Sequence, residues 1–115
     1  MFSNEKPIYM QLSTFLALDI VSGKYKTGEK IPSVRELSNI FKVNPNTALK
    51  ALSELEDLNL IYTERTNGKF VTKDKKVIDN YLKKLAFEKT KIYLNDMNKL
   101  GFNKNEIKDL IERCE

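Results

Sequence analysis

A capped helix start in this chain carries an arginine suited to binding an anion or a base edge. Ser33 and Glu36 have the Ser-x-x-Glu spacing of a capping box, which begins a helix, and Arg35 lies between them. The positive end of a helix disfavours a cation, so an arginine in that first turn indicates a phosphate or a guanine as its partner. We therefore predict that Arg35 contacts DNA.

A second helix start follows ten residues later. Asn44 is a good N-cap residue, and Pro45 suits the first helical position. The next polar side chains are Asn46, Thr47 and Lys50, which can pair with adenine, offer a hydroxyl or methyl group, and bind phosphate or guanine, respectively. No acidic residue occurs from residue 37 to residue 53. This helix start is therefore predicted to enter the major groove.

These side chains need a helix-turn-helix to position them. Apolar spacing predicts helices over residues 7–22, 34–41 and 45–58, and Asn59 is suited to the left-handed position that ends the third helix. Gly23 is expected to end the first helix in the same way. The residues expected to face inward are Ile8, Leu12, Phe15, Leu16, Ile20, Leu37, Ile40, Phe41, Ala48, Leu49 or Ala51, Leu52 and Leu55.

A β-hairpin is predicted directly after the third helix. Residues 60–64 and 69–72 favour strands, and Asn67-Gly68 between them is the dipeptide typical of a two-residue type I′ turn. Such a hairpin is a wing, so the fold class is mainly α with a small β-wing. The predicted DNA-binding residues of the helices and the wing tip are Ser33, Arg35, Asn44, Pro45, Asn46, Thr47, Lys50, Arg65, Asn67, Gly68 and Lys69.

The remaining residues predict a two-helix tail. A long helix over residues 74–98 ends near Gly101, and Asn103 with Glu106 begins a short last helix. We expect a winged helix-turn-helix domain over residues 1–73 and a dimerisation tail over 74–115; the alternative is a tail that folds back on its own winged helix. The predicted dimerisation residues are Ile78, Tyr81, Leu82, Leu85, Ile92, Leu100, Phe102, Ile107, Leu110 and Ile111.

Composition restricts the other classes of function. The net charge is +4, yet residues 1–74 hold ten basic and nine acidic side chains, so any attraction to DNA depends on where charges lie. There is no histidine and one cysteine, Cys114, which argues against an enzyme, a bound metal or another cofactor. The lone cysteine and the absence of an apolar run of about 20 residues predict a cytoplasmic protein without membrane contact.

The chain resembles the GntR family of bacterial transcription regulators. The similarity runs over residues 7–72 and includes Ile31-Pro32-Ser33-Val34-Arg35-Glu36-Leu37, Val43-Asn44-Pro45-Asn46-Thr47 and Phe70-Val71, while Leu100-Gly101-Phe102 in the short tail resembles the YtrA-type subfamily. The resemblance implies a homodimeric repressor on a palindromic operator in double-stranded DNA, with Arg35, Asn44, Asn46, Thr47 and Gly68 at the DNA. YtrA-type members often control neighbouring ABC-transporter operons.

Two residues depart from the family pattern, and two other functions remain open. Thr66 stands where the wing usually has a glycine, and Leu49 stands where small or polar residues are usual. One alternative is a regulator that senses a small-molecule effector in a pocket between tail and winged helix, lined by Tyr81, Phe87 and Tyr93. The other is a protein-interaction module without DNA binding, which the near-neutral residues 1–74 support.

Overall fold

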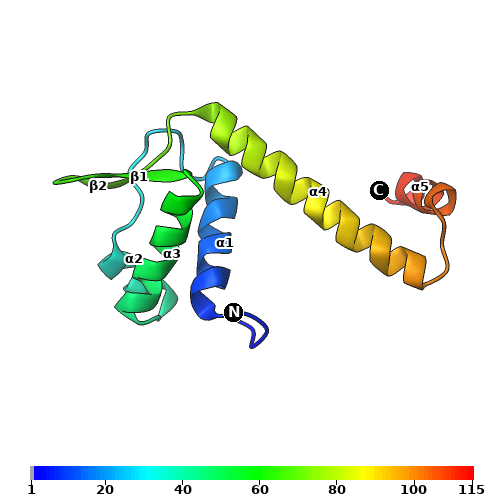
Figure 1. Ribbon diagram of the computed structural model, residues 1–115, viewed down its shortest axis with the longest axis horizontal. Helices are drawn as coiled ribbons and strands as arrows, with labels where there is room; N and C mark the ends of the chain where they lie inside the picture. Colours follow the sequence, from blue (N-terminus) through cyan, green and yellow to red (C-terminus); the bar gives the residue numbers. More distant parts are fainter. Residues whose placement is uncertain (1) are drawn as a thin grey trace. The chain divides into compact units, whose positions relative to one another are not determined.

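The computed structural model describes residues 2–115, which form five helices and one antiparallel two-stranded sheet (Figure 1). The predicted fold class, mainly helical with a β-wing, is confirmed. The chain divides into two compact units, Met1–Asn80 and Tyr81–Glu115. The functional division predicted at residue 74 stays a prediction. In chain order the elements are α1 (Ile8–Val21), α2 (Val34–Phe41), α3 (Pro45–Asp57), β1 (Ile61–Glu64), β2 (Gly68–Val71), α4 (Lys75–Lys99) and α5 (Lys104–Arg113).

The core of the first unit lies around α3, which packs against α1 on one side and α2 on the other (Figure 1). Ala51 rather than Leu49 takes the inward position on α3, because Leu49 is 49% exposed. The side chains that form this core are Leu12, Leu16, Ala17, Ile20, Ile31, Leu37, Ala48, Ala51, Leu52, Leu55, Leu60, Ile61 and Val71.

Three residues predicted to face inward are exposed, and a fourth, Phe41, is only half-buried. Ile40 is 62% exposed, because α2 contacts α3 through Leu37 and has only two turns. Ile8 and Phe15 are also exposed. The Phe15 ring stacks on Phe41, the last residue of α2, with a centroid separation of 6.5 Å.

The helix starts and ends follow the predicted signals. The capping box is complete, since Ser33 Oγ accepts from the Glu36 amide at 3.1 Å and the Ser33 amide donates to Glu36 Oε1 at 3.0 Å. The Asn44 side chain caps α3, and Pro45 is its first residue. Gly23 and Asn59 have φ of +88° and +60°, the left-handed geometry expected at these helix ends.

The wing differs from its prediction at the turn. Strands β1 and β2 pair from Ile61–Val71 to Glu64–Gly68, which leaves three residues in the loop rather than two. The Asn67 amide donates to the Glu64 carbonyl at 3.2 Å, and Gly68 follows with φ of +106°. This is a turn closed over residues 64–67 followed by a glycine bulge, so the type I′ prediction at Asn67-Gly68 is wrong.

A third segment, residues 28–31, borders the hairpin. Lys30 forms an isolated antiparallel bridge with Phe70 of β2. The Ile31 amide donates to the Lys69 carbonyl and the Val71 amide to the Glu29 carbonyl, each at 2.9 Å. These bonds join the approach to α2 to the outer strand of the wing, which fixes the wing relative to the helices.

The second unit consists of most of α4, a turn and α5. Gly101 has φ of +95° and ends the long helix as predicted, and Asn103 with Glu106 forms the predicted capping box of α5. Across all 25 residues of α4 no side chain is buried. Among residues 2–115, no helix combines the length and apolar character that crossing a membrane requires.

Candidate nucleic-acid interface

The start of α2 presents an arginine that has no partner in the part of the chain that the structure describes. Arg35 is exposed, and within residues 2–115 its guanidinium makes no hydrogen bond or ion pair. The neighbouring Glu36 carboxylate is held by the capping box, and the Ser33 hydrogen bonds hold the pKa of Glu36 below its ordinary value. Arg35 is therefore available to an external anion, while Ser33 and Glu36 stabilise the helix start.

The polar residues at the start of α3 have two roles: one caps the helix, and others are exposed to solvent. Asn44 Oδ1 accepts from the Asn46 amide at 2.8 Å, so this oxygen is already used within the chain. Asn46 and Lys50 are exposed, and Thr47 is half-buried. The ammonium of Lys50 lies 5.6 Å from the centre of the Tyr9 ring, which anchors this lysine against α1. Asn46 is therefore the freest polar side chain of this turn, while Lys50 is exposed but rests on the Tyr9 ring.

At the wing tip, one predicted residue is free and another is held. Arg65 is exposed, and its guanidinium has no hydrogen bond or ion pair in the described chain. Asn67 Nδ2 donates to Glu64 Oε2 at 3.1 Å, which holds the tip together. Gly68 lies at the bulge, where its positive φ makes a side chain strained.

Lys69 has a different position from the one predicted for a tip residue. Its ammonium pairs with the Glu56 carboxylate of α3 and donates to Thr63 Oγ1 at 2.8 Å, and Thr63 Oγ1 donates to Glu56 at 3.0 Å. The hydrogen bond from Lys69 holds the pKa of Glu56 below its ordinary value. This trio, which we call the wing clamp, joins β1 and β2 to the C-terminal end of α3.

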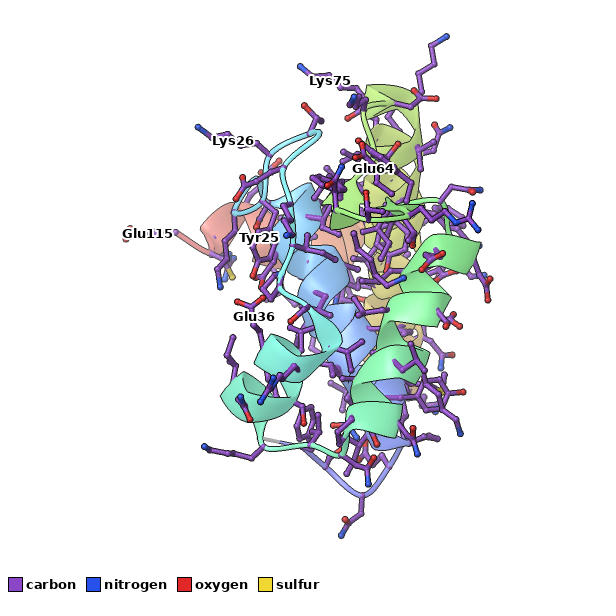
Figure 2. All side chains as sticks on the ribbon, turned by 90° about the vertical axis from the view of Figure 1, so that its left-hand side faces the viewer. Tyr25, Lys26, Glu36, Glu64, Lys75 and Glu115 are labelled. Atoms are coloured by element: carbon purple, nitrogen blue, oxygen red, sulfur yellow. The ribbon has the colours of Figure 1, made fainter. Side chains whose placement is uncertain are left out.

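Within the first unit, the two helix starts and the wing belong to one face. Figure 2 views the structure from the side toward which the hairpin points in Figure 1, and α2, α3 and the hairpin lie in front of α1. Because α2 and β1 both contact α3, the spacing of these three parts is fixed by packing. The structure thus places α2, α3 and the wing on one side of a compact unit.

One cation beside the wing was not predicted from the sequence. A methyl group built on the Gly68 Cα would lie 3.0 Å from Lys30 Cε and 3.6 Å from Lys30 Nζ. Lys30 is exposed and makes no hydrogen bond or ion pair within residues 2–115. No local signal in the sequence indicates this position, because it depends on pairing between segments forty residues apart.

The residues predicted for dimerisation include several exposed apolar side chains. Ile92 is 63% and Leu100 is 71% exposed, and Leu82 and Ile111 are also exposed. Ile107 is the exception, since its side chain is buried in the single chain. Ile78, Tyr81, Leu85, Phe102 and Leu110 are half-buried.

The first unit has a hollow at the end of α1 and another beside the start of α2. One of 440 Å³ lies between the end of α1, the following turn and the start of α4, and is lined by Ile20, Tyr25 and Ile78 among others. The other, of 350 Å³, is lined by Tyr25, Lys30, Ile31, Pro32 and Glu36. Neither is lined by Tyr81, Phe87 or Tyr93, the residues of the predicted effector pocket. Among the described residues, no three carboxylate or thiol side chains are grouped to hold a metal ion.

Known relatives match both the chain and its fold. The chain is 35% identical to the HTH-type transcriptional regulator YhcF of Bacillus subtilis over 92% of its length and 88% of the relative's. It is 41% identical to the HTH-type transcriptional repressor YtrA of the same organism, over 61% of its length and 54% of YtrA. The chain therefore spans nearly all of one relative and about half of the other.

Solved structures give the same result. A GntR family transcriptional regulator from Listeria monocytogenes superposes with a TM-score of 0.92 at 39% identity, covering 99% of this chain and all of that one. The DNA-binding domain of AraR, solved in complex with operator ORX1, matches 63% of this chain and 93% of that domain with a TM-score of 0.59 at 30% identity.

The family model that matches the chain covers the region described above. It is the model of bacterial regulatory proteins of the gntR family, and it matches residues 8–71, from the first residue of α1 to the last residue of β2. The family and the relatives named here are transcriptional regulators, so the chain is a regulatory protein and not an enzyme. On these matches, the chain belongs to the gntR family of bacterial regulatory proteins.

Proposed function

We propose that this protein is a homodimeric repressor that binds a palindromic operator through the face formed by α2, α3 and the wing. The observation that carries the proposal is Arg35, an exposed arginine without a partner among residues 2–115, at the positive end of a capped helix. Such a position disfavours a cation unless an anion or a guanine edge meets it. The start of α3 enters the major groove in this proposal, and the wing contacts the backbone or the minor groove.

Electrostatics support this docking through placement. Residues 1–74 are almost neutral, with ten basic and nine acidic side chains. The three acidic residues of α3, Glu54, Glu56 and Asp57, lie at its far end, and Glu56 is already paired within the wing clamp. The start of α3 therefore offers amides and cations to DNA without an opposing carboxylate nearby in the sequence.

The relatives support repression and operator binding. YtrA is named a transcriptional repressor, and the DNA-binding domain of AraR was solved with an operator. By analogy with the YtrA-type subfamily, an ABC-transporter operon is the candidate target of this chain. A homodimer is supported by α4, which exposes apolar side chains over 25 residues and buries none.

The test is to enrich DNA bound by the full chain from a random duplex pool, and then to measure binding of the Arg35→Ala variant. We expect the enriched sequence to be a palindrome. The variant should bind it about 100-fold more weakly or worse, because each bidentate contact contributes about 1–3 kcal/mol and occurs once per subunit. The variant should remain a folded dimer, because Arg35 has no partner among residues 2–115.

The matched control is Arg113→Ala, which removes an exposed arginine of α5 paired only with Asp109. It should bind the enriched DNA as the unaltered chain does. Undiminished binding by the Arg35→Ala variant would overturn the docking proposed here. Absence of enriched DNA at every salt concentration would favour the interaction module over the repressor.

A further inference from the structure

We propose that Lys30, which precedes α2 and lies against the wing, neutralises a DNA phosphate between the wing and the start of α2. This inference rests on the proposed function and adds a binding residue to it. Two lysines lie at the wing: Lys69 belongs to β2, and Lys30 lies beside that strand. The structure gives them different surroundings, and only one of them has an ammonium that is free.

Lys69 is occupied within the chain. Its side chain is 20% exposed, and its ammonium pairs with Glu56 and donates to Thr63. Binding a phosphate would require this lysine to leave both partners and would leave the Glu56 carboxylate uncompensated. Lys69 is thus a positioning residue for the wing. The positive charge that the sequence analysis predicted to contact DNA at the wing must come from another side chain.

Lys30 meets that requirement because its backbone moves with the wing and its side chain is free. The bridge to Phe70 and the neighbouring hydrogen bonds of Ile31 and Val71 fix its main chain to β2. Its Nζ lies beside Gly68, the residue at the bulge of the wing, where no side chain screens it. A phosphate that approached this bulge would meet the Lys30 ammonium directly.

The same lysine is also near the start of α2. Lys30 and Glu36 line the same 350 Å³ hollow, and the lysine adds to the lowering of the pKa of that carboxyl group by the Ser33 hydrogen bonds, yet the two side chains form no ion pair. The Glu36 carboxylate accepts from the Ser33 amide instead. Lys30 therefore lies between the helix start that carries Arg35 and the wing, and it can bind a phosphate between the contacts that these two parts make.

The experiment measures how binding of the enriched palindromic DNA depends on salt for the unaltered chain and the Lys30→Gln variant. We expect the slope of log K against log salt to fall in magnitude by about 0.9 for each bound subunit, with the affinity lowered about tenfold per subunit at 0.1 M salt. Lys30→Arg should restore the slope. The expected loss is uniform across DNA sequences, because a phosphate carries no base information.

The matched control is Lys26→Gln, four residues earlier on the same turn. Lys26 is exposed and also lacks an ion pair among residues 2–115, but in Figure 2 its side chain points away from Glu64 and the hairpin. The Lys26→Gln variant should keep the unaltered slope. An unchanged slope for Lys30→Gln, or equal reductions for both variants, would overturn the role of Lys30 and leave the repressor intact. Failure of the unaltered chain to bind DNA would overturn both proposals.

Discussion

At the residue scale, the polar side chains of the candidate interface divide by whether the chain already uses them. The side-chain oxygens of Ser33 and Asn44 each accept a hydrogen bond from a backbone amide in a helix cap, and the Glu36 carboxylate completes the first cap by accepting from the Ser33 amide. Arg35 has no such use. Caps of this kind contribute about 1 kcal/mol to a helix whether or not a ligand binds. We therefore expect the residues that discriminate between DNA sequences to be those whose side chains make no cap or other contact within the chain.

Leu49 is one such residue, and we predict that it reads a thymine methyl group. It is a leucine 49% exposed on α3, between Ala48 and Lys50, and no core element covers it. Apolar contact with a thymine methyl is a recognised mode of base reading. Replacing thymine by uracil in the enriched operator removes that methyl, and at the contacted position it should weaken binding about fourfold, as expected for about 0.8 kcal/mol per buried methyl.

The Leu49→Ala variant should lose this discrimination, binding thymine and uracil operators alike in a gel-shift titration. Leu58→Ala, which alters an exposed leucine at the opposite end of α3, is the matched control and should keep it. If the Leu49→Ala variant still preferred thymine at the same position by the same factor, a different group would be reading the methyl.

At the element scale, the helices were predictable from the sequence because their signals are local. Ser33, Asn44 and Asn103 cap helices within three residues of themselves, and the structure begins α2, α3 and α5 directly after them. Gly23 and Asn59 likewise end helices through their own φ angles. For the same reason, the residues at the starts of α2 and α3 could be predicted as a group.

The wing was less predictable because its geometry depends on contacts between distant segments. The loop is one residue longer than Asn67-Gly68 suggests, since the pairing of Glu64 with Gly68 decides where the turn closes. The bridge from Lys30 to Phe70 and the pairing of Lys69 with Glu56 have no local signal at all. The exposure of side chains on α2 also depends on tertiary packing, and for this reason the prediction that Ile40 faces inward is wrong.

The wing clamp makes stability depend on pH. The pKa of Glu56 is lowered in the folded protein, below its unfolded value of about 4.3. The contribution of the Glu56–Lys69 ion pair to the free energy of unfolding is therefore complete above that pH. The contribution is lost as the pH falls through the lowered pKa. We expect Glu56→Gln to reduce the free energy of unfolding in urea by about 0.5–1 kcal/mol at pH 7, the range for a partly exposed ion pair.

The difference between the unaltered chain and the Glu56→Gln variant should shrink toward zero as the pH is lowered below 4. Glu54→Gln, on the same helix and without an ion pair among residues 2–115, should show little difference at either pH. A gap of constant size across this pH range would mean that the ion pair with Lys69 is not the source of the stability.

At the scale of the whole molecule, the second unit has many apolar side chains but buries few of them within the single chain. Its apolar side chains recur along α4 and α5, yet only Ile107 is buried among residues 81–115. Most of the stability of a helix in a protein comes from packing its apolar face, and α4 buries no side chain within the single chain. A second copy of the chain would cover these apolar side chains, and it would also supply the two-fold symmetry of a palindromic operator.

The dimer proposed on this basis predicts that a polar group at Ile92 separates the subunits. Ile92→Asn should raise the dissociation constant of the dimer about 100-fold or more, because burying an isoleucine contributes about 1.5–3 kcal/mol and a two-fold interface loses it twice. Sedimentation equilibrium measures this dissociation constant, with Lys89→Asn on the same helix as the matched control.

The Ile92→Asn variant should keep a folded winged helix, because the core of that domain contains no residue of α4. It should bind the operator only at concentrations that restore the dimer. A monomeric unaltered chain, or an Ile92→Asn dimer of unchanged affinity, would instead favour a tail that folds back on its own winged helix.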